Sequence, residues 1–240
     1  MRYRLFFLVE AVIGALIALL LTSAVAAQQQ PAAQTIVYSA TMNGQGGRMG
    51  SGGQTIAFTL NVAIKSVDPD GTRHATIAMQ AQGMPGVDKA PEDATMTPAG
   101  AILPKDTAVG KPHANMTEAE SYALAATGIG AMLSMQLRPF NSFAETCAKQ
   151  KALVAGMSWH ADSQIGNAPV DTIYTVKGTE QKAGHNATLV TLQDASSGGA
   201  ELKGQGYYDP VAHLVVAIHY ELHSPNSPES EVFDIGLVNS

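Results

Sequence analysis

Apolar and polar residues alternate along much of the chain, and this alternation predicts β-strands. In TIAFTLNVAIKSV, residues 55–67, every second residue from Ile56 to Ile64 is apolar. Successive side chains of a strand point to opposite faces, so this spacing predicts a strand with one buried face. The same alternation occurs at residues 35–42 and 73–80, and DPDG at 68–71 supplies a turn between two of these segments. Residues 35–110 are therefore expected to form antiparallel strands.

A second group of alternating segments lies in the C-terminal part of the chain, between residues 157 and 238. The candidate strands there are residues 157–164, 171–179, 186–192, 200–208, 211–223 and 232–238. The segment 83–116, by contrast, contains five prolines. Proline cannot donate a hydrogen bond to a neighbouring strand, so this segment is expected to hold at most a short edge strand, at about residues 94–102.

Residues 117–153, between the two groups of strands, carry the signals of a helical insert. Thr117 and Glu120 form a capping-box pattern, and the 17 residues after Glu120 hold no charge until Arg138. A helix that is apolar on every side belongs in a core, in a membrane or against an apolar ligand. The segment is short for a membrane span, which favours a buried helix. A second helix is expected at about residues 142–153.

These patterns together predict an α+β fold that is mostly antiparallel β. Strands, then helices, then strands indicate one domain over residues 28–240, with a curved sheet, half-barrel or sandwich-like, packing against the central helical insert. If the insert covers an apolar ligand, the side chains expected to contact that ligand are Tyr122, Leu124, Ile129, Met132, Leu133 and Met135.

The first 27 residues have the pattern of a secretory signal peptide. Arg2 and Arg4 precede a long apolar run, and Ala24-Val25-Ala26 is a small-x-small cleavage pattern. The alternative is an uncleaved membrane anchor, but Glu10 interrupts the apolar run. We therefore expect a periplasmic or secreted protein with no stable membrane span after cleavage.

The charge balance limits which partners the protein can bind, and the cysteine content limits how its fold can be stabilised. The chain has 14 Lys and Arg against 20 Asp and Glu, with a formal net charge of −6 and no basic cluster. This balance argues against nucleic acid and against anionic membrane surfaces as partners. The single cysteine, Cys147, cannot form an internal disulfide and is expected to be a buried, unreactive thiol. The fold must therefore be stabilised by its core.

The segment VAHLVVAIHYELH, residues 211–223, raises the question of a metal site. Its even positions are apolar, whereas the odd positions end in His219, Glu221 and His223. Alternate residues of a strand lie about 6.5–7 Å apart on one face, so one zinc or copper ion would be bound by two of the three together with a ligand from a neighbouring strand. The other interpretation, which we favour, is the solvated face of a half-buried strand.

The segment SWHAD contains the residue types of a hydrolase triad, Ser158, His160 and Asp162. Their alternation places all three in parallel on one strand, whereas a triad needs nucleophile, base and orienting group in mutual contact. The Gly-x-Ser-x-Gly pattern is also absent from the sequence. The sequence therefore predicts no catalytic constellation.

The leading functional prediction is an exported, non-catalytic protein of the cell envelope that binds an apolar ligand or a protein partner. It would use the concave face of its sheet and the helical insert. No cofactor is expected, and the partners are a hydrophobic small molecule or an envelope protein. Two alternatives remain: a zinc- or copper-binding periplasmic protein, and a hydrolase of unrecognised type.

Overall fold

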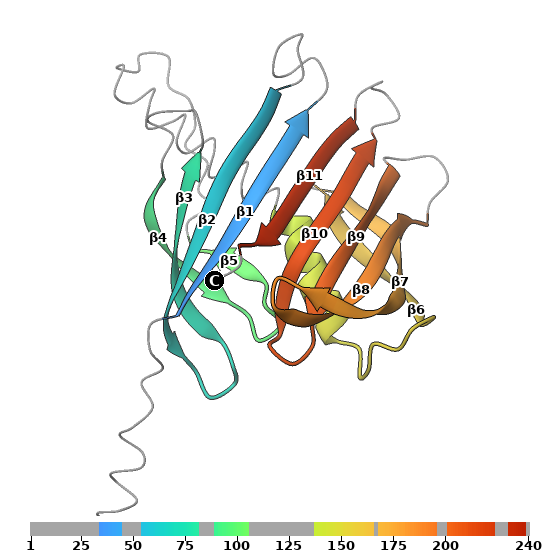
Figure 1. Ribbon diagram of the computed structural model, residues 1–240, viewed down its shortest axis with the longest axis horizontal. Coiled ribbons are helices and arrows are strands. Elements are labelled where there is room, and N and C mark those ends of the chain that lie inside the picture. Colours follow the sequence, from blue (N-terminus) through green and yellow to red (C-terminus); the bar gives the residue numbers. More distant parts are fainter. Residues whose placement is uncertain are drawn as a thin grey trace, which may run out of the picture. The chain divides into compact units, whose positions relative to one another are not determined.

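A single antiparallel sheet of eleven strands dominates the computed structural model (Figure 1). The structure describes residues 34–44, 54–81, 89–105, 137–165, 168–195, 201–223 and 230–238. In chain order the strands are β1 (Thr35–Gly44), β2 (Gln54–Val67), β3 (Arg73–Ala81), β4 (Lys89–Met96), β5 (Ile102–Pro104), β6 (Ser158–Ile165), β7 (Ala168–Lys182), β8 (His185–Asp194), β9 (Glu201–Asp209), β10 (Leu214–His223) and β11 (Ser230–Leu237).

The order of the strands in space differs from their order in the chain at one point only. The sheet reads β5-β4-β3-β2-β1-β11-β10-β9-β8-β7-β6. Strand β1 lies near the middle of the sheet, and β2 to β5 follow outward to one edge. Strand β6 forms the opposite edge, and β7 to β11 follow inward. Strand β11 then pairs with β1 in antiparallel register, with Tyr38 opposite Leu237. The predicted antiparallel architecture is confirmed, and it takes the form of one open sheet.

The alternating pattern of β2 is reproduced in the burial of its side chains. Ile56, Phe58, Leu60, Val62 and Ile64 are all buried. The predicted turn at 68–71 is also present, because the amide of Gly71 donates to the carbonyl of Asp68 over 2.9 Å and Gly71 has a φ of 89°. A positive φ of this size favours glycine, which explains why the turn ends at this residue.

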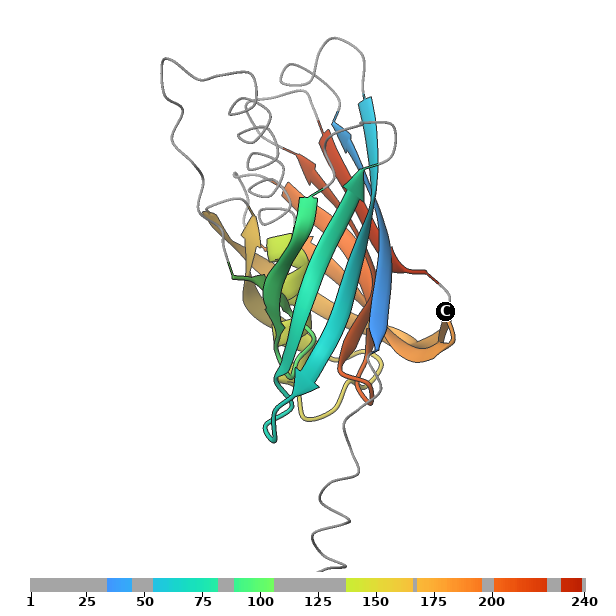
Figure 2. The ribbon, with the colours of Figure 1, turned by 90° about the vertical axis from the view of Figure 1, so that its left-hand side faces the viewer.

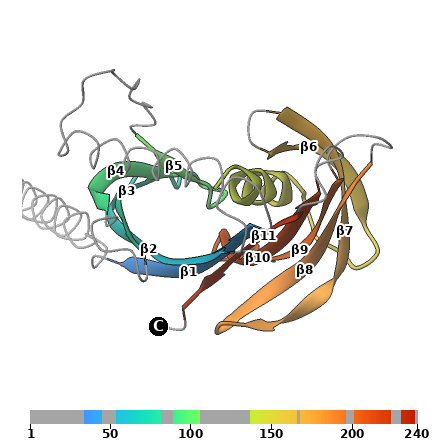
Figure 3. The ribbon, with the colours of Figure 1, turned by 90° about the horizontal axis from the view of Figure 1, so that it is seen from above.

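Residues 137–148 form a helix on the concave side of the curved sheet (Figures 2 and 3). Phe140 packs edge-on against Tyr38 of β1 with ring centroids 5.5 Å apart, and Phe143 lies 6.5 Å from the ring of Tyr174 on β7. The helix thus contacts both halves of the sheet. The predicted second helix, residues 142–153, was placed too far along the chain, because hydrogen bonding from Lys149 to Glu145 and from Gln150 to Cys147 closes the last turn.

The helix also covers the edge of the sheet at β5. The side-chain amide of Asn141 accepts a hydrogen bond from the Ile102 N–H and donates one to the Ile102 carbonyl, both over 2.7 Å. An edge strand has unpaired backbone groups that can pair with another chain. Asn141 satisfies two of these groups at once.

Replacing Asn141 with aspartate is expected to lower the free energy of unfolding by about 1–3 kcal/mol, the usual cost of leaving a hydrogen-bonding group unsatisfied. The carboxylate still accepts from the Ile102 N–H but cannot donate to its carbonyl. Urea denaturation at neutral pH measures the change. Asn186→Asp is the matched control, because the Asn186 side chain is an acceptor for Gln181 and aspartate keeps that role. Equal stability of both variants would contradict the prediction.

Candidate functional site

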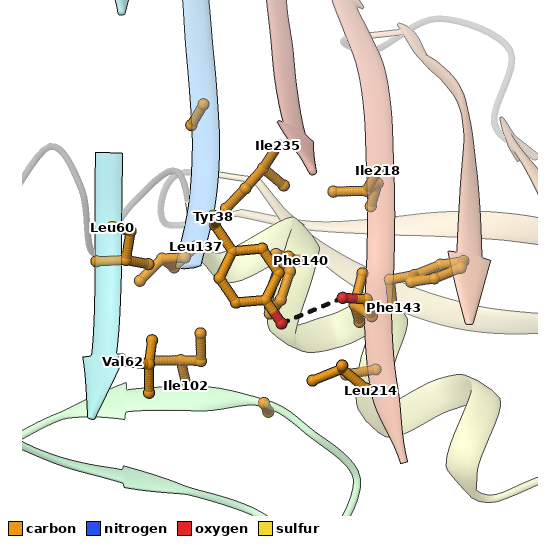
Figure 4. Close-up of a cluster of buried hydrophobic side chains, with 14 of the residues drawn as sticks. Tyr38, Leu60, Val62, Ile102, Leu137, Phe140, Phe143, Leu214, Ile218 and Ile235 are labelled. Atoms are coloured by element: carbon orange, nitrogen blue, oxygen red, sulfur yellow. Dashed lines mark hydrogen bonds between the residues drawn. The ribbon is translucent and has the colours of Figure 1, made fainter. Parts of the chain in front are cut away.

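The concave face of the sheet is apolar across both halves. Side chains from β1, β2, β5, β10 and β11 converge around Phe140 of the helix (Figure 4), namely Tyr38, Leu60, Val62, Ile102, Leu214, Ile218 and Ile235, and all of them are buried. Tyr38 is the polar member of this group, and its hydroxyl donates to the carbonyl of Val215 over 3.1 Å. Burial raises the pKa of the Tyr38 phenol above its usual value, so this hydroxyl stays a neutral donor.

One end of the concave face is closed by two turns. The turn between β9 and β10 meets the turn between β4 and β5, which belongs to the other half of the sheet. The hydroxyl of Tyr208 donates to the Ala99 carbonyl over 3.2 Å, and the Arg73 guanidinium donates to the Ala212 carbonyl over 3.1 Å. A Cβ atom on Gly100 would lie 2.6 Å from the His213 carbonyl oxygen, so only glycine permits this approach.

Asp209 stabilises the β9–β10 turn at this closed end. Its Oδ1 accepts the backbone N–H groups of Val211 and Ala212 over 2.8 and 3.0 Å, and its Oδ2 lies 2.9 Å from Nδ1 of His185. Burial raises the pKa of Asp209, but hydrogen bonds from Ala212, His185 and Val211 outweigh burial, and the net pKa is lowered.

This lowered pKa predicts a pH dependence of stability. A carboxyl whose pKa is lower in the folded state contributes stability above its unfolded pKa of about 3.9, and that stability is lost as the pH falls through the folded pKa. The stability advantage of the wild type over Asp209→Asn is therefore expected to shrink as the pH falls from about 5 to about 2. Urea denaturation across this range measures it, with Glu201→Gln, an exposed carboxyl, as the control. A difference that does not change with pH would contradict the prediction.

A small polar patch interrupts the apolar concave face on β6 and β7, at the edge of the sheet opposite to β5. Trp159 stacks on Tyr174 with ring centroids 5.5 Å apart and planes 7° from parallel. The Tyr174 hydroxyl is hydrogen-bonded to Ser163 Oγ over 2.5 Å, and the Thr172 hydroxyl donates to the Val170 carbonyl over 2.9 Å. Burial is the main reason that the pKa of Tyr174 is raised to about 12.

Within this patch, the indole N–H of Trp159 is buried, and it has no hydrogen-bond partner in the described part of the chain. Our sequence interpretation passed over this residue. It stands in SWHAD between the outward-facing Ser158 and His160, so the strand alternation alone assigns Trp159 to the inner face. The sequence could have indicated this residue, because it places a tryptophan at an inward position of a strand.

Cys147 lies on the buried side of the helix and is 1% exposed, which confirms the predicted burial. Burial also raises the pKa of its thiol, so little reactive thiolate is present at neutral pH. We expect thiol reagents to label the native protein slowly and the urea-unfolded protein completely. The ratio of the two rates, followed by mass spectrometry, reports how often the helix separates from the sheet. Rapid stoichiometric labelling of the native protein would contradict the packing described here.

The convex face of β10 carries the three predicted metal ligands. His219 Nδ1 lies 2.6 Å from Asp234 Oδ1, and His219 Nε2 lies 3.5 Å from Glu221 Oε1. The distance from His223 Nε2 to Glu221 Oε2 is 3.9 Å. The three residues thus share one face, as the alternation predicts, and form successive histidine–carboxylate pairs. Among the described residues, no group of three or more histidine, cysteine or acidic side chains is arranged to hold a metal ion. Metal binding by these residues stays a prediction.

A β-bulge changes the alternation at the start of β10. The pairing of β10 with β9 shifts between Val215 and Ala217, and Val215 rather than Val216 joins the main core cluster. A bulge inserts one extra residue and disrupts the alternation, so the adjacent residues Leu214 and Val215 both belong to the core cluster. The strict alternation that we expected over residues 211–223 therefore holds only after the bulge.

A groove of about 850 Å³ lies on the convex face over β8, β9 and β10, beside His219 and Glu221. Its other polar walls include Lys177, Gln193 and Lys203. The volume falls in the range of small-molecule sites, but such sites are mostly apolar, and this groove is open and of mixed charge. It is a weaker candidate than the concave face.

The residue types in SWHAD do not form a triad in the structure. Ser158 Oγ lies 2.9 Å from the hydroxyl of Thr175, and His160 Nδ1 lies 3.3 Å from Asp171 Oδ1. The serine and the histidine therefore each have a separate partner on β7. This arrangement gives the serine no base to activate it.

The six side chains predicted to contact an apolar ligand, Tyr122 to Met135, lie outside the described residues. The predicted signal peptide does so as well. In the described ranges, no helix has the length and apolar character needed to cross a membrane.

Comparison with known proteins gives little beyond remote structural likeness. No family model matches the sequence, and no curated protein matches it. A DUF1329 family protein from Desulfovibrio piger is similar at 10% identity and a TM-score of 0.20, over 86% of this chain and 85% of that one. A putative outer membrane lipoprotein-sorting protein domain from Vibrio parahaemolyticus is similar at 9% identity and a TM-score of 0.24, over 85% of each chain. Likeness at this level carries no conclusion about function.

Proposed function

We propose that this is an exported, non-catalytic protein of the cell envelope that holds an apolar small molecule against the concave face of its sheet. The observation that carries the proposal is the apolar character of that face, which extends over both halves of the sheet. Ligand sites of this kind are concave, mostly apolar and equipped with a few polar groups that orient the ligand. The concave face has this composition, with its polar patch on β6 and β7.

The closed end suggests where the ligand binds. The two turns around Gly100 and His213 block one end of the concave face. Toward the other end, Phe58, Tyr220 and Phe233 form an aromatic cluster on β2, β10 and β11, with centroid distances of 6.4 and 5.1 Å. Aromatic rings offer a large apolar surface. We place the ligand next to this cluster, with access from the end away from the turns.

The helical insert would cover the ligand from the side opposite the sheet. In this proposal Tyr122, Leu124, Ile129, Met132, Leu133 and Met135 supply the covering apolar surface. A protein partner that presents an apolar side chain or acyl chain is the alternative occupant of the same face.

Binding of N-phenyl-1-naphthylamine, a dye that fluoresces in apolar surroundings, tests the proposal. We expect saturable binding by the folded protein, together with energy transfer from Trp159, which is the only tryptophan of the chain. Ile129→Glu and Met132→Glu are expected to weaken binding at least tenfold, because a charge in an apolar site is costly. Val154→Glu is the control, since Val154 is 62% exposed. A folded protein that binds no dye would overturn the proposal.

Export is tested separately. The mature protein isolated from the exported fraction is expected to lack about the first 27 residues. Its intact mass decides the point, and an unprocessed chain in the membrane fraction would contradict cleavage.

A further inference from the structure

The indole N–H of Trp159 is a buried donor on the concave face that has no hydrogen-bond acceptor in the described part of the chain. The ring packs against the main core cluster and stacks on Tyr174, and its nitrogen is shielded from solvent. Buried polar groups in native proteins are nearly always hydrogen-bonded, so each exception needs an explanation. An unmade bond at this position is costly for the protein unless something else supplies the acceptor.

The buried tyrosine hydroxyls on the same face are hydrogen-bonded within the protein itself. The hydroxyls of Tyr38 and Tyr208 donate to the Val215 and Ala99 carbonyls, and that of Tyr174 is paired with Ser163. The chain therefore satisfies three buried tyrosine hydroxyls on this face and leaves the indole of Trp159 without an acceptor among the described residues. The contrast points to a bond that is made only when a ligand is bound.

We propose that Trp159 Nε1 donates a hydrogen bond to a neutral carbonyl oxygen of the ligand, such as the ester or amide carbonyl of an acyl chain. This inference rests on the proposed function, since it assigns the polar end of the same apolar ligand. The indole nitrogen is only a donor, so the ligand must supply an acceptor. The apolar chain would then lie along the concave face, away from the edge formed by β6.

The charges around the patch favour a neutral acceptor over a carboxylate. The field of Asp162 acts on the hydroxyl of Tyr174, and the acidic Asp194 lies opposite Thr172 where β8 pairs with β7. An anionic headgroup at this position would lose its hydration without gaining an opposite charge. An ester or amide oxygen avoids this cost and still accepts the bond.

Displacement of the bound dye by three ligands of equal chain length tests the inference. The ligands are methyl laurate, dodecane and laurate. We expect methyl laurate to bind about five- to tenfold more tightly than dodecane, which is the value of one hydrogen bond, and laurate to bind no more tightly than the ester. Trp159→Phe keeps an aromatic ring against Tyr174 but lacks the donor, so the advantage of the ester over the alkane should disappear. Tyr207→Phe, which removes a hydroxyl from the convex face, should leave the advantage unchanged.

The possible outcomes separate this inference from the proposed function. If methyl laurate and dodecane displace the dye equally well from the wild type, the hydrogen bond proposed for Trp159 is wrong, whereas the proposed apolar site is still supported. The same holds if Trp159→Phe keeps the full preference for the ester, or if laurate binds most tightly. If none of the three ligands competes with the dye, the proposed function itself fails. Should Trp159→Phe not fold, the emission of Trp159 in the wild type decides, because only the ester should shift it to longer wavelength relative to dodecane.

Discussion

Replacing Phe140 with alanine is expected to lower the free energy of unfolding by about 3–5 kcal/mol. Phe140 is 0% exposed and packs edge-on against Tyr38, in the cluster where the helix meets both halves of the sheet. Removing the ring leaves a cavity among side chains of β1, β2, β5, β10 and β11, which come from both halves of the sheet. Those strands are held by their own pairing, so we expect the cavity to collapse only in part.

Urea denaturation followed by the fluorescence of Trp159 measures this effect. Leu103→Ala is the matched control, because Leu103 lies on the neighbouring edge strand but is 46% exposed, and its change should stay within about 0.5 kcal/mol. A loss below about 1 kcal/mol for Phe140→Ala would mean that the helix is not part of the cooperative core. Faster thiol labelling of Cys147 in Phe140→Ala would show that the destabilised element is the helix.

Substitution of the two glycines of β9 should have the next largest effect. A Cβ atom on Gly206 would lie 2.4 Å from the Phe143 ring, and one on Gly204 would lie 2.3 Å from the His219 carbonyl oxygen. Both distances are too short for real contacts, so a neighbour must move. Overpacking of this kind costs about 1–3 kcal/mol, and we expect each alanine variant to fall in or above this range.

The neighbours that would have to move differ between Gly206 and Gly204, and this difference can be used to test the close packing. The Gly206 side meets a ring, so Phe143→Leu should recover part of the stability of Gly206→Ala in a double-mutant cycle. The Gly204 side meets backbone, and the same second substitution should give no recovery. Gly236→Ala is the control, because its Cβ atom would have its nearest neighbour at 3.7 Å, an ordinary contact. Equal stability of the three alanine variants would contradict the close packing at β9.

The sequence predicted the strands well where one face of the strand is buried along its whole length. Residues 55–67 show this, because β2 keeps a strict alternation from Ile56 to Ile64. The sequence did not predict the bulge at Val215, because a bulge is set by the pairing of two strands and leaves no period in either one. It also underestimated β4, which extends back past Pro91. The pairing of β4 with β3 has a register shift at this point, and a proline is tolerated at such an irregularity.

Less of the candidate site than of the strands could be predicted from the sequence. The convex side chains His219 and Glu221 were placed on one face by alternation alone, and they lie there in the structure. Trp159, by contrast, matters because its nitrogen is buried without a partner, and hydrogen bonding of a single side chain depends on the three-dimensional neighbourhood. The closed end could not be predicted either, since Gly100 and His213 come together from opposite halves of the sheet.

The pairing of β1 with β11 has a consequence for the nascent polypeptide. Among the described strands β1 is synthesised first, yet one of its two edges finds its partner only when β11, nearly 200 residues later, has been made. Local hairpins can form early, but this junction joins distant parts of the chain and is expected to form slowly. Until then the open edge of β1 can pair with other chains, and its apolar side chains can drive aggregation. We therefore expect the newly made protein to depend on a holding chaperone until β11 is available.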